Sequence, residues 1–437
     1  MREFDKSQVA NTEEQQNGEE ATKEAHAAEL TASGSAVPKG WIKTVGVVFS
    51  GQLFSFLTAT AAGYALIWYL TITGSAMLLV LGTVCYLLPM AFLSPFIGSF
   101  VDRYNRKHIM ILANLFIIVL TVLMIFLVTI GLVSVPIVLS MIALRSTGET
   151  FHMTAMNAAL PLLVPSRHLV RVSSVTSGLS AAGNIVGPAI GIILFESFGL
   201  HAALSIDIGG SIIACGVLFF ASIPDVHLAV EERTKVLREM RDGLAAIREK
   251  KGMTSFFVFV AVACGFIMPM AALFPLMTVQ HFGGDGFSAA LIEAIWGACF
   301  LAGTIILGIW GGGKRLTMII RCSLGFCGLI ALLCGLLPSD GFWWFFALTG
   351  LLAIFEVLFD TPLLAVIQRN IAPEKLGRVL SVFNSLISIA SLVGLGLAGA
   401  LGEITGVALI FIISGVGILL VFFVALFLPS INRLDKS

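Results

Sequence analysis

Five ionisable side chains lie within otherwise apolar stretches of this sequence: Arg145, Glu149 and His152 in one, and Glu356 and Asp360 in another. Spacings of four and seven residues place each group on one face of a helix. Charged groups are costly in apolar surroundings, so they are functional candidates by default. Such carboxylates could take up and release protons. The structural alternatives are a buried Arg145–Glu149 pair and a hydrogen-bonded core His152.

Three further polar side chains of the apolar stretches are candidates for a site or for contact with water. Gln52 lies in the first stretch, where it could line an adaptable apolar cavity together with Phe and Met side chains. Asp207 and Glu293 fall within about two helical turns of the predicted outer ends of their stretches. We therefore expect these two carboxylates to reach interfacial water.

The stretches that position these residues are those of a membrane protein. The 437 residues are 57% hydrophobic and 12% charged, and the mean hydropathy is +0.98, whereas soluble domains carry roughly 25% charged residues. The formal net charge is +0, so the chain lacks the basic field that a nucleic-acid partner would need. The seven cysteines show no CxxC spacing, which favours packing over metal or disulfide chemistry.

Twelve apolar runs follow residue 41, each long enough to cross about 30 Å of hydrocarbon as a helix. They do not alternate apolar and polar residues as the strands of a membrane barrel do. The sequence therefore predicts an all-α membrane protein with twelve transmembrane helices. The expected spans are 42–69, 75–100, 109–131, 134–163, 171–196, 202–223, 254–281, 288–311, 316–337, 342–368, 379–403 and 407–429.

The pattern divides the chain into five parts. The first part is polar and acidic, which predicts a disordered cytoplasmic tail. In the connector, Leu237, Met240, Leu244 and Ile247 recur at helical spacing and predict an amphipathic surface helix. The parts are the tail (1–40), a six-helix half (41–223), the cytoplasmic connector (224–253), a second six-helix half (254–429) and a short cytoplasmic tail (430–437).

Charge in the short breaks between spans predicts the orientation. Breaks after the even-numbered spans are basic, as in 102–108, 165–171, 311–316 and 369–378. Breaks on the other side contain no Lys or Arg, and four of the six contain an acid. Loops rich in Lys and Arg stay in the cytoplasm, so both termini are expected there.

The two halves repeat one another. Residues 164–199 parallel residues 372–406 at an offset near 207, which pairs Glu196 with Glu403 and Gly199 with Gly406. Internal repeats of this kind are common in transporters, whose binding sites lie between the repeats near the membrane midplane. The sequence therefore predicts two pseudo-symmetric halves with a site between them.

The break GSFVDRYNRKH (98–108) carries more than topological charge. Gly98, Asp102, Arg103, Arg106 and Lys107 match G-x-x-x-D-[RK]-x-G-[RK]-[RK], and this pattern resembles that of the major facilitator superfamily. The resemblance implies that the motif latches the outward-facing state and gates the conformational cycle. A carboxylate at a helix end can pair with Arg or with a helix N-terminus across the halves. The corresponding segment GIWGGGKRLT (308–317) lacks the acid, so one strong latch is expected.

A second motif lies in the fifth span. Gly183, Gly187, Pro188 and Gly191 resemble the signature of proton-coupled drug antiporters, although Ile192 replaces its final Gly. Glycines four residues apart also allow helices to approach closely, and Pro188 removes a backbone donor. Antiport and ordinary tight packing therefore both remain as interpretations of this motif.

A more specific resemblance, to the macrolide-efflux family of drug/proton antiporters, rests on stretches of both halves: 145–165, 239–252, 271–276 and 376–379. It implies export of a bulky, largely apolar, macrolide-like molecule across a bacterial cytoplasmic membrane in exchange for protons, and hence antibiotic resistance. Arg145 and His152 fit the family's stretch, whereas Glu149 is not expected there. The proton gradient would be the energy source, with no cofactor, and the protein would act as a monomer.

Other functions are less favoured. Export of a siderophore or lipid-like metabolite is the main alternative, followed by nutrient uptake. A channel would need a ring of charges or carbonyls, which the sequence does not supply. An enzyme would need a nucleophile and base or a metal cluster, and neither HExxH nor GxSxG occurs. We expect neither catalysis nor metal binding.

Overall fold

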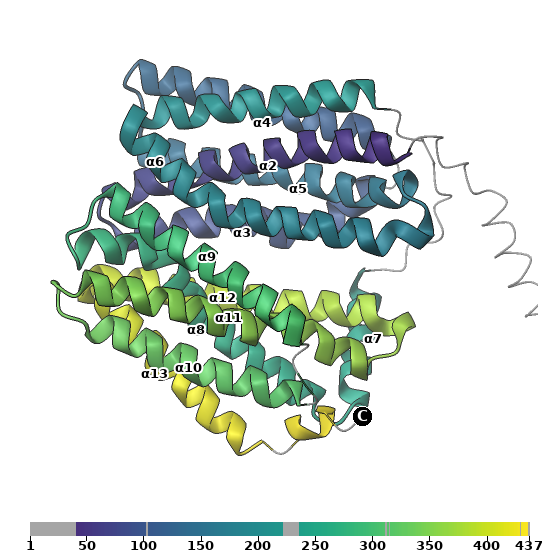
Figure 1. The fold of residues 1–437 in the computed structure, drawn as a ribbon, viewed down its shortest axis with the longest axis vertical. Helices are drawn as coiled ribbons and strands as arrows, with labels where there is room; N and C mark the ends of the chain where they lie inside the picture. Colours follow the sequence, from purple (N-terminus) through teal and green to yellow (C-terminus); the bar gives the residue numbers. More distant parts are fainter. Residues whose placement is uncertain are drawn as a thin grey trace, which may run out of the picture.

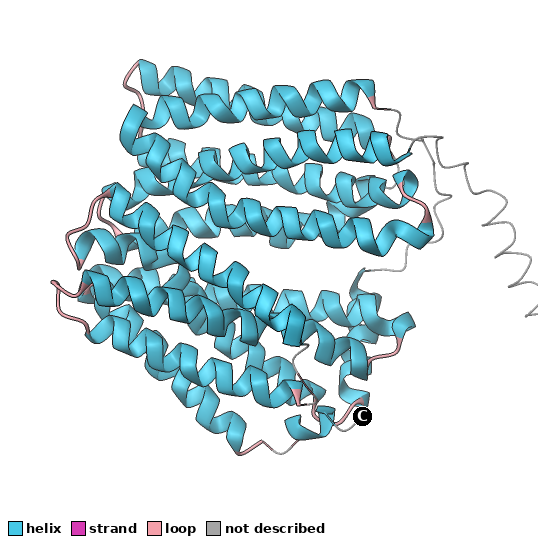
Figure 2. Cartoon of the chain, in the orientation of Figure 1, coloured by secondary structure: helices cyan, strands magenta, loops and turns pink. Residues whose placement is uncertain are grey.

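The computed structural model describes residues 41–101, 104–221, 236–310, 313, 315–428 and 430–435. Every regular element among them is a helix (Figure 2). The predicted all-α membrane fold is thus confirmed. The predicted N-terminal tail and the first part of the connector lie outside the described residues.

Five long helices form the first half of the bundle. Apolar runs of more than 20 residues favour helices here, because a helix satisfies its backbone hydrogen bonds within the segment. The last of the five contains two predicted spans, separated at Gly199, whose φ of 78° breaks the helical path. The helices are α2 (Trp41–Ile72), α3 (Ala76–Val101), α4 (Arg106–Thr129), α5 (Val135–Leu163) and α6 (Ser166–Phe220).

The connector helix and six long helices follow. Figure 1 places the two halves one above the other, with α7 and the C-terminus at the right. We call the end of the bundle opposite α7 the distal end. The elements are α7 (Val236–Glu249), α8 (Met253–Gln280), α9 (Gly286–Trp310), α10 (Leu316–Leu336), α11 (Phe342–Asn370), α12 (Pro373–Thr405), α13 (Val407–Leu426) and a 3-10 turn, η1 (Ile431–Asp435).

Ten of the described helices are long and apolar enough to cross a membrane. The difference from the twelve predicted spans has two causes. Helix α6 counts once although it contains two spans, and α5 is left out because Arg145, Glu149 and His152 lower its hydropathy. Polar residues inside a membrane helix are therefore what sets α5 apart from its neighbours.

Packing within each half is close. In the first half α2 packs along α6 and α4 packs against both α5 and α6; in the second half α8 packs on α12 and α13. Between the halves, α6 contacts α9 and α3 contacts α12. The hydrogen bonds between the halves, among the described residues, join Ser75 and Met77 to Glu403 and Gln280 to Gly74. All of these residues lie at the distal end.

Helix α7 is attached to the second half. Ile247 is 2% exposed within its core, whereas Leu244 is 38% exposed. Gly243 lies against the backbone of Arg378 in α12, where a Cβ would come within 2.7 Å of the carbonyl oxygen. The side chains of Leu237 and Met240, which complete the predicted apolar face, lie outside the described residues.

Candidate functional site

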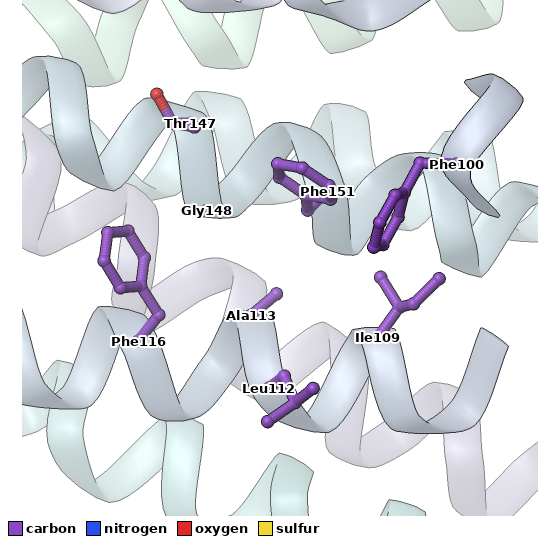
Figure 3. A pocket seen from close by; sticks show the side chains of 8 residues that line it. All are labelled: Phe100, Ile109, Leu112, Ala113, Phe116, Thr147, Gly148 and Phe151. Atoms are coloured by element: carbon purple, nitrogen blue, oxygen red, sulfur yellow. The ribbon is translucent and has the colours of Figure 1, made fainter. Parts of the chain in front are cut away.

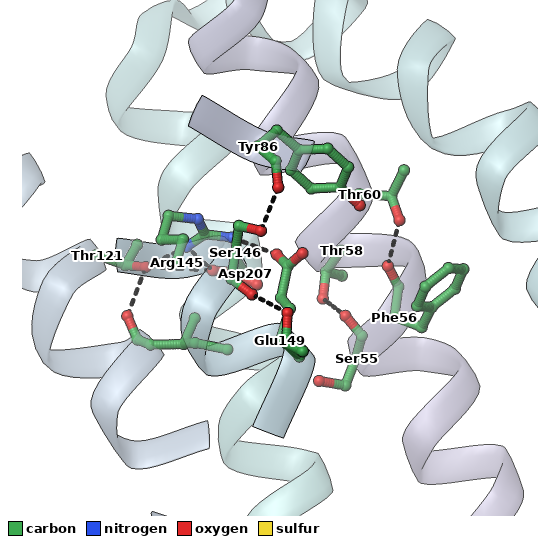
Figure 4. Close-up of polar contacts among 12 residues, drawn as sticks. Ser55, Phe56, Thr58, Thr60, Tyr86, Thr121, Arg145, Ser146, Glu149 and Asp207 are labelled. Atoms are coloured by element: carbon green, nitrogen blue, oxygen red, sulfur yellow. Dashed lines mark hydrogen bonds and ion pairs between the residues drawn. The ribbon is translucent and has the colours of Figure 1, made fainter. Parts of the chain in front are cut away.

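A buried polar network joins three helices of the first half (Figure 4). Arg145 Nη1 of α5 donates to Asp207 Oδ2 of α6 and to Thr121 Oγ1 of α4, both at 2.6 Å. The Thr121 hydroxyl also lies 2.8 Å from the Ile117 carbonyl oxygen and 3.2 Å from Asp207 Oδ2. Arg145 is 3% exposed and both partners are 0% exposed. The charges are thus paired within the helix bundle, as burial requires.

The expectation that Asp207 reaches interfacial water is wrong. Its side chain is fully buried and forms the closer ion pair with Arg145. Depth along a span does not reveal which neighbour a side chain faces, and here the face of α6 that carries Asp207 packs against α4. The signal in the sequence was the need of a buried Arg145 for a compensating acid.

Glu149 is a second acid beside the same guanidinium group. Its Oε1 lies 3.9 Å from Arg145 Nη2, and its side chain is 27% exposed, against 1% for Asp207. Figure 4 shows its carboxylate toward the side where α2 carries Ser55 and Thr58. Since Arg145 holds one positive charge, the ionised cluster has one negative charge in excess. A proton or a cationic group would balance that charge.

His152 does not join this network. Its Nδ1 lies 3.5 Å from the Met110 carbonyl oxygen of α4, and the side chain is half-buried. No hydrogen bond joins it to Arg145 or Glu149, which are described with it. The structural alternative, a hydrogen-bonded core histidine, therefore accounts for its contacts.

The second half has its own acid. Trp296 Nε1 of α9 donates to Glu356 Oε2 of α11 at 3.0 Å, and the Trp296 ring lies 5.1 Å from that of Phe300. Asp360, one turn further along α11, is exposed and makes no hydrogen bond or ion pair with another described residue. A carboxylate beside an aromatic ring is a setting suited to the cationic or polar group of a large apolar molecule.

Gln52 is buried in α2 with both amide atoms unpartnered among the described residues. A buried amide without partners costs free energy unless a bound water or ligand satisfies it. Asp207 Oδ1 and Arg145 Nη2 are likewise without a hydrogen bond. The first half therefore offers several unsatisfied polar atoms to a proton, water or cargo.

Lys107 of the latch motif binds within the first half. Lys107 Nζ donates to the carbonyl oxygens of Phe219 and Ala221, at 2.8 Å each, and so caps the C-terminus of α6. Arg106 is buried and Gly98 half-buried. Asp102 and Arg103 lie outside the described residues, so the expected pairing across the halves remains a prediction.

Asn105, which departs from the motif, caps the N-terminus of α4. Asn105 is the N-cap of α4, and its side-chain oxygen accepts from the His108 backbone N–H at 3.2 Å. Asparagine is among the favoured N-cap residues because it satisfies one of the free backbone donors. The residue that replaces the family's glycine therefore starts the third span.

The glycines of the second motif pack α6 against α2. A Cβ at Gly191 would lie 2.1 Å from the Ala61 carbonyl oxygen, and one at Gly187 would lie 2.6 Å from the Thr60 side chain. Gly183 faces Phe56, and Pro188 lies inside α6 without ending the helix. Close packing is thus an observed role of these residues, and the antiport interpretation remains a prediction.

An apolar groove of about 310 Å³ lies between α4 and α5 (Figure 3). Leu112 is 64% exposed at its edge, so the groove opens on the outside of the helix bundle. It is separate from the charged cluster and suits lipid chains rather than a charged ligand. Its lining residues are Phe100, Ile109, Leu112, Ala113, Phe116, Thr147, Gly148 and Phe151. The described residues contain no cluster of His, Cys, Asp and Glu that could hold a metal ion.

Comparisons with known proteins agree with this geometry. The model of the Major Facilitator Superfamily matches residues 48–339 and 313–436. Macrolide efflux protein A of Streptococcus pyogenes is 32% identical over 404 residues, which cover 91% of this chain and 98% of that protein. Macrolide efflux protein A of Enterococcus faecalis is 32% identical over 329 residues, covering 74% of this chain and 100% of that protein.

Solved structures share the fold at low identity. The nucleoside transporter NupG aligns with a TM-score of 0.66 at 13% identity, covering 87% of this chain and 98% of its own. The peptide transporter POT, solved in complex with sulfate, aligns with a TM-score of 0.68 at 13% identity, covering 90% and 96%. These similarities concern the arrangement of helices and carry no information on cargo.

Proposed function

This chain belongs to the Major Facilitator Superfamily and is an efflux transporter similar to macrolide efflux proteins, and we propose that it exports a bulky, largely apolar molecule in exchange for protons. The proposed cargo is macrolide-like, because the names of the similar proteins state macrolide efflux. One chain contains both halves, so we propose a monomer as the transport unit. The proton gradient supplies the energy, and no cofactor is proposed.

One observation carries the coupling step: Glu149 stands beside an arginine whose charge Asp207 already balances. Releasing a proton from Glu149 therefore creates an uncompensated negative charge inside the bundle. That charge is costly in low-dielectric surroundings until a proton or a cargo group neutralises it. Protonation and cargo binding at this site would then exclude one another, which is the requirement for exchange.

The second half supplies the proposed cargo contacts. Glu356 is held by Trp296, and Asp360 on the next turn is exposed. Aromatic side chains around a few polar groups are typical of sites for large apolar ligands. Gln52 of α2 adds an unsatisfied amide from the first half. We propose that these residues orient cargo between the halves while Glu149 exchanges the proton.

For orientation we propose that the end carrying α7 faces the cytoplasm and the distal end faces outward, because the basic breaks lie at the α7 end. Cysteine introduced at Ser339, in the distal loop between α10 and α11, should react with an impermeant reagent in intact cells. Cysteine at Ser166, where α6 begins, should react only after permeabilisation. The reverse pattern would overturn the orientation.

The function itself is tested in everted vesicles and in living cells. When a macrolide is added to energised everted vesicles that contain the unchanged protein, protons should leave the lumen. In vesicles with the Glu149→Gln variant, the macrolide should bind without proton release. Cells that express the protein should tolerate higher macrolide concentrations. If expression leaves macrolide tolerance unchanged and raises tolerance to a siderophore analogue, the cargo is a siderophore and not a macrolide. If the cargo enters the cell together with protons, the protein is an uptake transporter and not an exporter.

A further inference from the structure

Two acids related by the internal repeat lie at the distal end. Glu403 follows Glu196 by 207 residues, and each precedes by three positions a glycine with a positive φ: Gly199 with φ 78° and Gly406 with φ 84°. At both glycines the chain leaves one span and enters the next. The repeat therefore places two carboxylates at equivalent helix ends, one in each half.

Glu403 of the second half binds the start of a helix in the first half. Its Oε2 accepts from the Ser75 hydroxyl at 3.1 Å and from the Met77 backbone N–H at 3.3 Å. Ser75 precedes α3, and its Oγ accepts from the Leu78 backbone N–H at 3.2 Å. A carboxylate at this position satisfies a free backbone donor and interacts favourably with the positive end of the helix dipole.

Glu196 of the first half packs against the start of a helix in the second half, α9, where Asp285 accepts the Ser288 backbone N–H. A Cβ at Gly286, the first residue of α9, would lie 2.1 Å from Glu196 Cγ and 2.6 Å from its Oε1. The carboxylate thus fills the space beside the helix start that a side chain would otherwise take. Trp68 Nε1 of α2 holds the same oxygen at 2.7 Å, which fixes the carboxylate against α9.

The two contacts lie along one seam between the halves. Gln280 donates to the Gly74 carbonyl, and Ala76 lies 3.0 Å from the position of a Cβ at Gly402. Ala76 and Ala289 are 3% and 1% exposed, each in a core cluster that includes residues of both halves. Opening of the distal end must separate both carboxylates from the helix starts they contact and must expose both alanines.

We propose that Glu196 and Glu403 are paired positioning residues that hold the distal ends of the two halves together while the α7 end is open, and that both release their helix starts in the opposite state. The resemblance to the superfamily assigns a latch for the outward-facing state to the Asp102 motif at the α7 end. The distal acids would oppose that latch. Neither contact involves the proposed cargo or proton site.

The test measures how often the distal end opens. Cysteine is introduced at Ala289 in one set and at Ala76 in another, and its reaction with an impermeant maleimide is followed in intact cells, with the parent protein in parallel to correct for the native cysteines. Glu403→Gln is combined with Ala289→Cys and Glu196→Gln with Ala76→Cys. Each reporter cysteine then lies beside the glutamate that is left unchanged. A change in its labelling therefore cannot come from local disorder around the substituted glutamate.

We expect each Glu→Gln change to raise the labelling rate by about fivefold, since one carboxylate at a helix start contributes up to about 1 kcal/mol at an exposed site. The double change should raise it further. Asp340→Asn is the matched control, because Asp340 lies in the distal loop between α10 and α11 of one half, and it should leave the rate unchanged. Labelling rates in both single variants and the double variant that equal the rate of the same reporter cysteine with both glutamates intact would overturn the proposal.

A second measurement follows the separation of the halves by cross-linking, in variants whose amount in the membrane equals that of the protein with both glutamates intact. The Ala76 Cβ lies 3.0 Å from the position of a Cβ at Gly402, so cysteines at both positions would need to move apart only slightly to reach the Cβ–Cβ distance of a disulfide, about 3.8 Å. The two cysteines should cross-link readily when both glutamates are intact and more slowly with Glu196→Gln. The labelling requires the proposed orientation, which the Ser339 and Ser166 labels test separately. It requires no cargo, so its failure leaves the efflux proposal intact.

Discussion

The two halves of this bundle differ in how their helices are held together. Helices α5 and α11 both contain 29 residues, and α11 begins 207 residues after α5, so Glu356 is the counterpart of Glu149. At the same offset Arg145 corresponds to Leu352 and Asp207 to Ser414. One half is held by a buried ion pair, and the other has a buried leucine and serine at those positions.

Close glycine packing takes the place of the charges in the second half. A Cβ at Gly415 of α13 would lie 2.4 Å from the Leu332 backbone nitrogen of α10, and one at Gly328 of α10 would lie 3.0 Å from the Leu419 backbone nitrogen of α13. Gly328 is the counterpart of Thr121. Helices of a membrane bundle can therefore pack closely without a buried ion pair such as Arg145–Asp207. We therefore propose that the pair serves the coupling step, and that the second half contacts the cargo.

The largest expected effect comes from giving the first half the residues of the second. Arg145→Leu alone leaves Asp207 buried without a partner, and Asp207→Ser alone leaves Arg145 with only the more distant Glu149. Each should lower the free energy of unfolding by about 3–5 kcal/mol. The double variant should recover most of that loss while export fails. Thermal unfolding in detergent measures this, and a double variant no more stable than the singles would break the comparison.

The next prediction distinguishes the role of Glu149 in the first half from that of Glu356 and Asp360 in the second. Glu149→Gln should reduce gradient-driven export by tenfold or more, since loss of about 1.4 kcal/mol of coupling corresponds to tenfold. Glu356→Gln should weaken cargo binding and leave the response to the proton gradient intact, and Asp360→Asn should resemble it. Export against imposed pH gradients in vesicles distinguishes these outcomes. If all three variants keep full gradient-driven export, the acids are structural partners and the coupling assignment is wrong.

A smaller effect is expected at Trp296. Trp296→Phe keeps an aromatic ring and removes the hydrogen bond to Glu356, so the carboxylate loses its fixed position. We expect cargo affinity to fall by about fivefold, or about 1 kcal/mol, in line with a typical hydrogen bond. Trp344→Phe, at an exposed position near the distal start of α11, is the control. Equal affinity in both variants would remove the second half from the cargo site.

The smallest effect concerns the asymmetric latch. Asp102→Asn keeps the basic charges that set topology and removes the acid that the second half lacks. Insertion should be unchanged and transport slowed by about twofold to fivefold, since a carboxylate at a helix terminus contributes about 0.3–1 kcal/mol. Initial export rates normalised to protein in the membrane measure it. An unchanged rate would reduce the motif to a topological signal.

Much of the fold could be read from the order of apolar and polar residues. Helical spans, the halves and the shared face of Arg145 and Glu149 follow from hydrophobic length and the 3.6-residue period. The role of Asp207 did not follow, because a single sequence gives depth along a helix and not the neighbour across it. The same limit applies to His152, whose contact is a backbone carbonyl of α4.

By itself the sequence determined what local chemistry and hydrophobicity control: membrane insertion, helix lengths and the repeat that relates Glu196 to Glu403. Only the tertiary structure decided which groups meet across helices. It paired Arg145 with Asp207, left Glu149 as the excess acid, and seated each distal carboxylate on a helix start of the opposite half. The physical reason is that burial demands partners for every charge and free backbone donor, and packing alone determines which partners lie within reach.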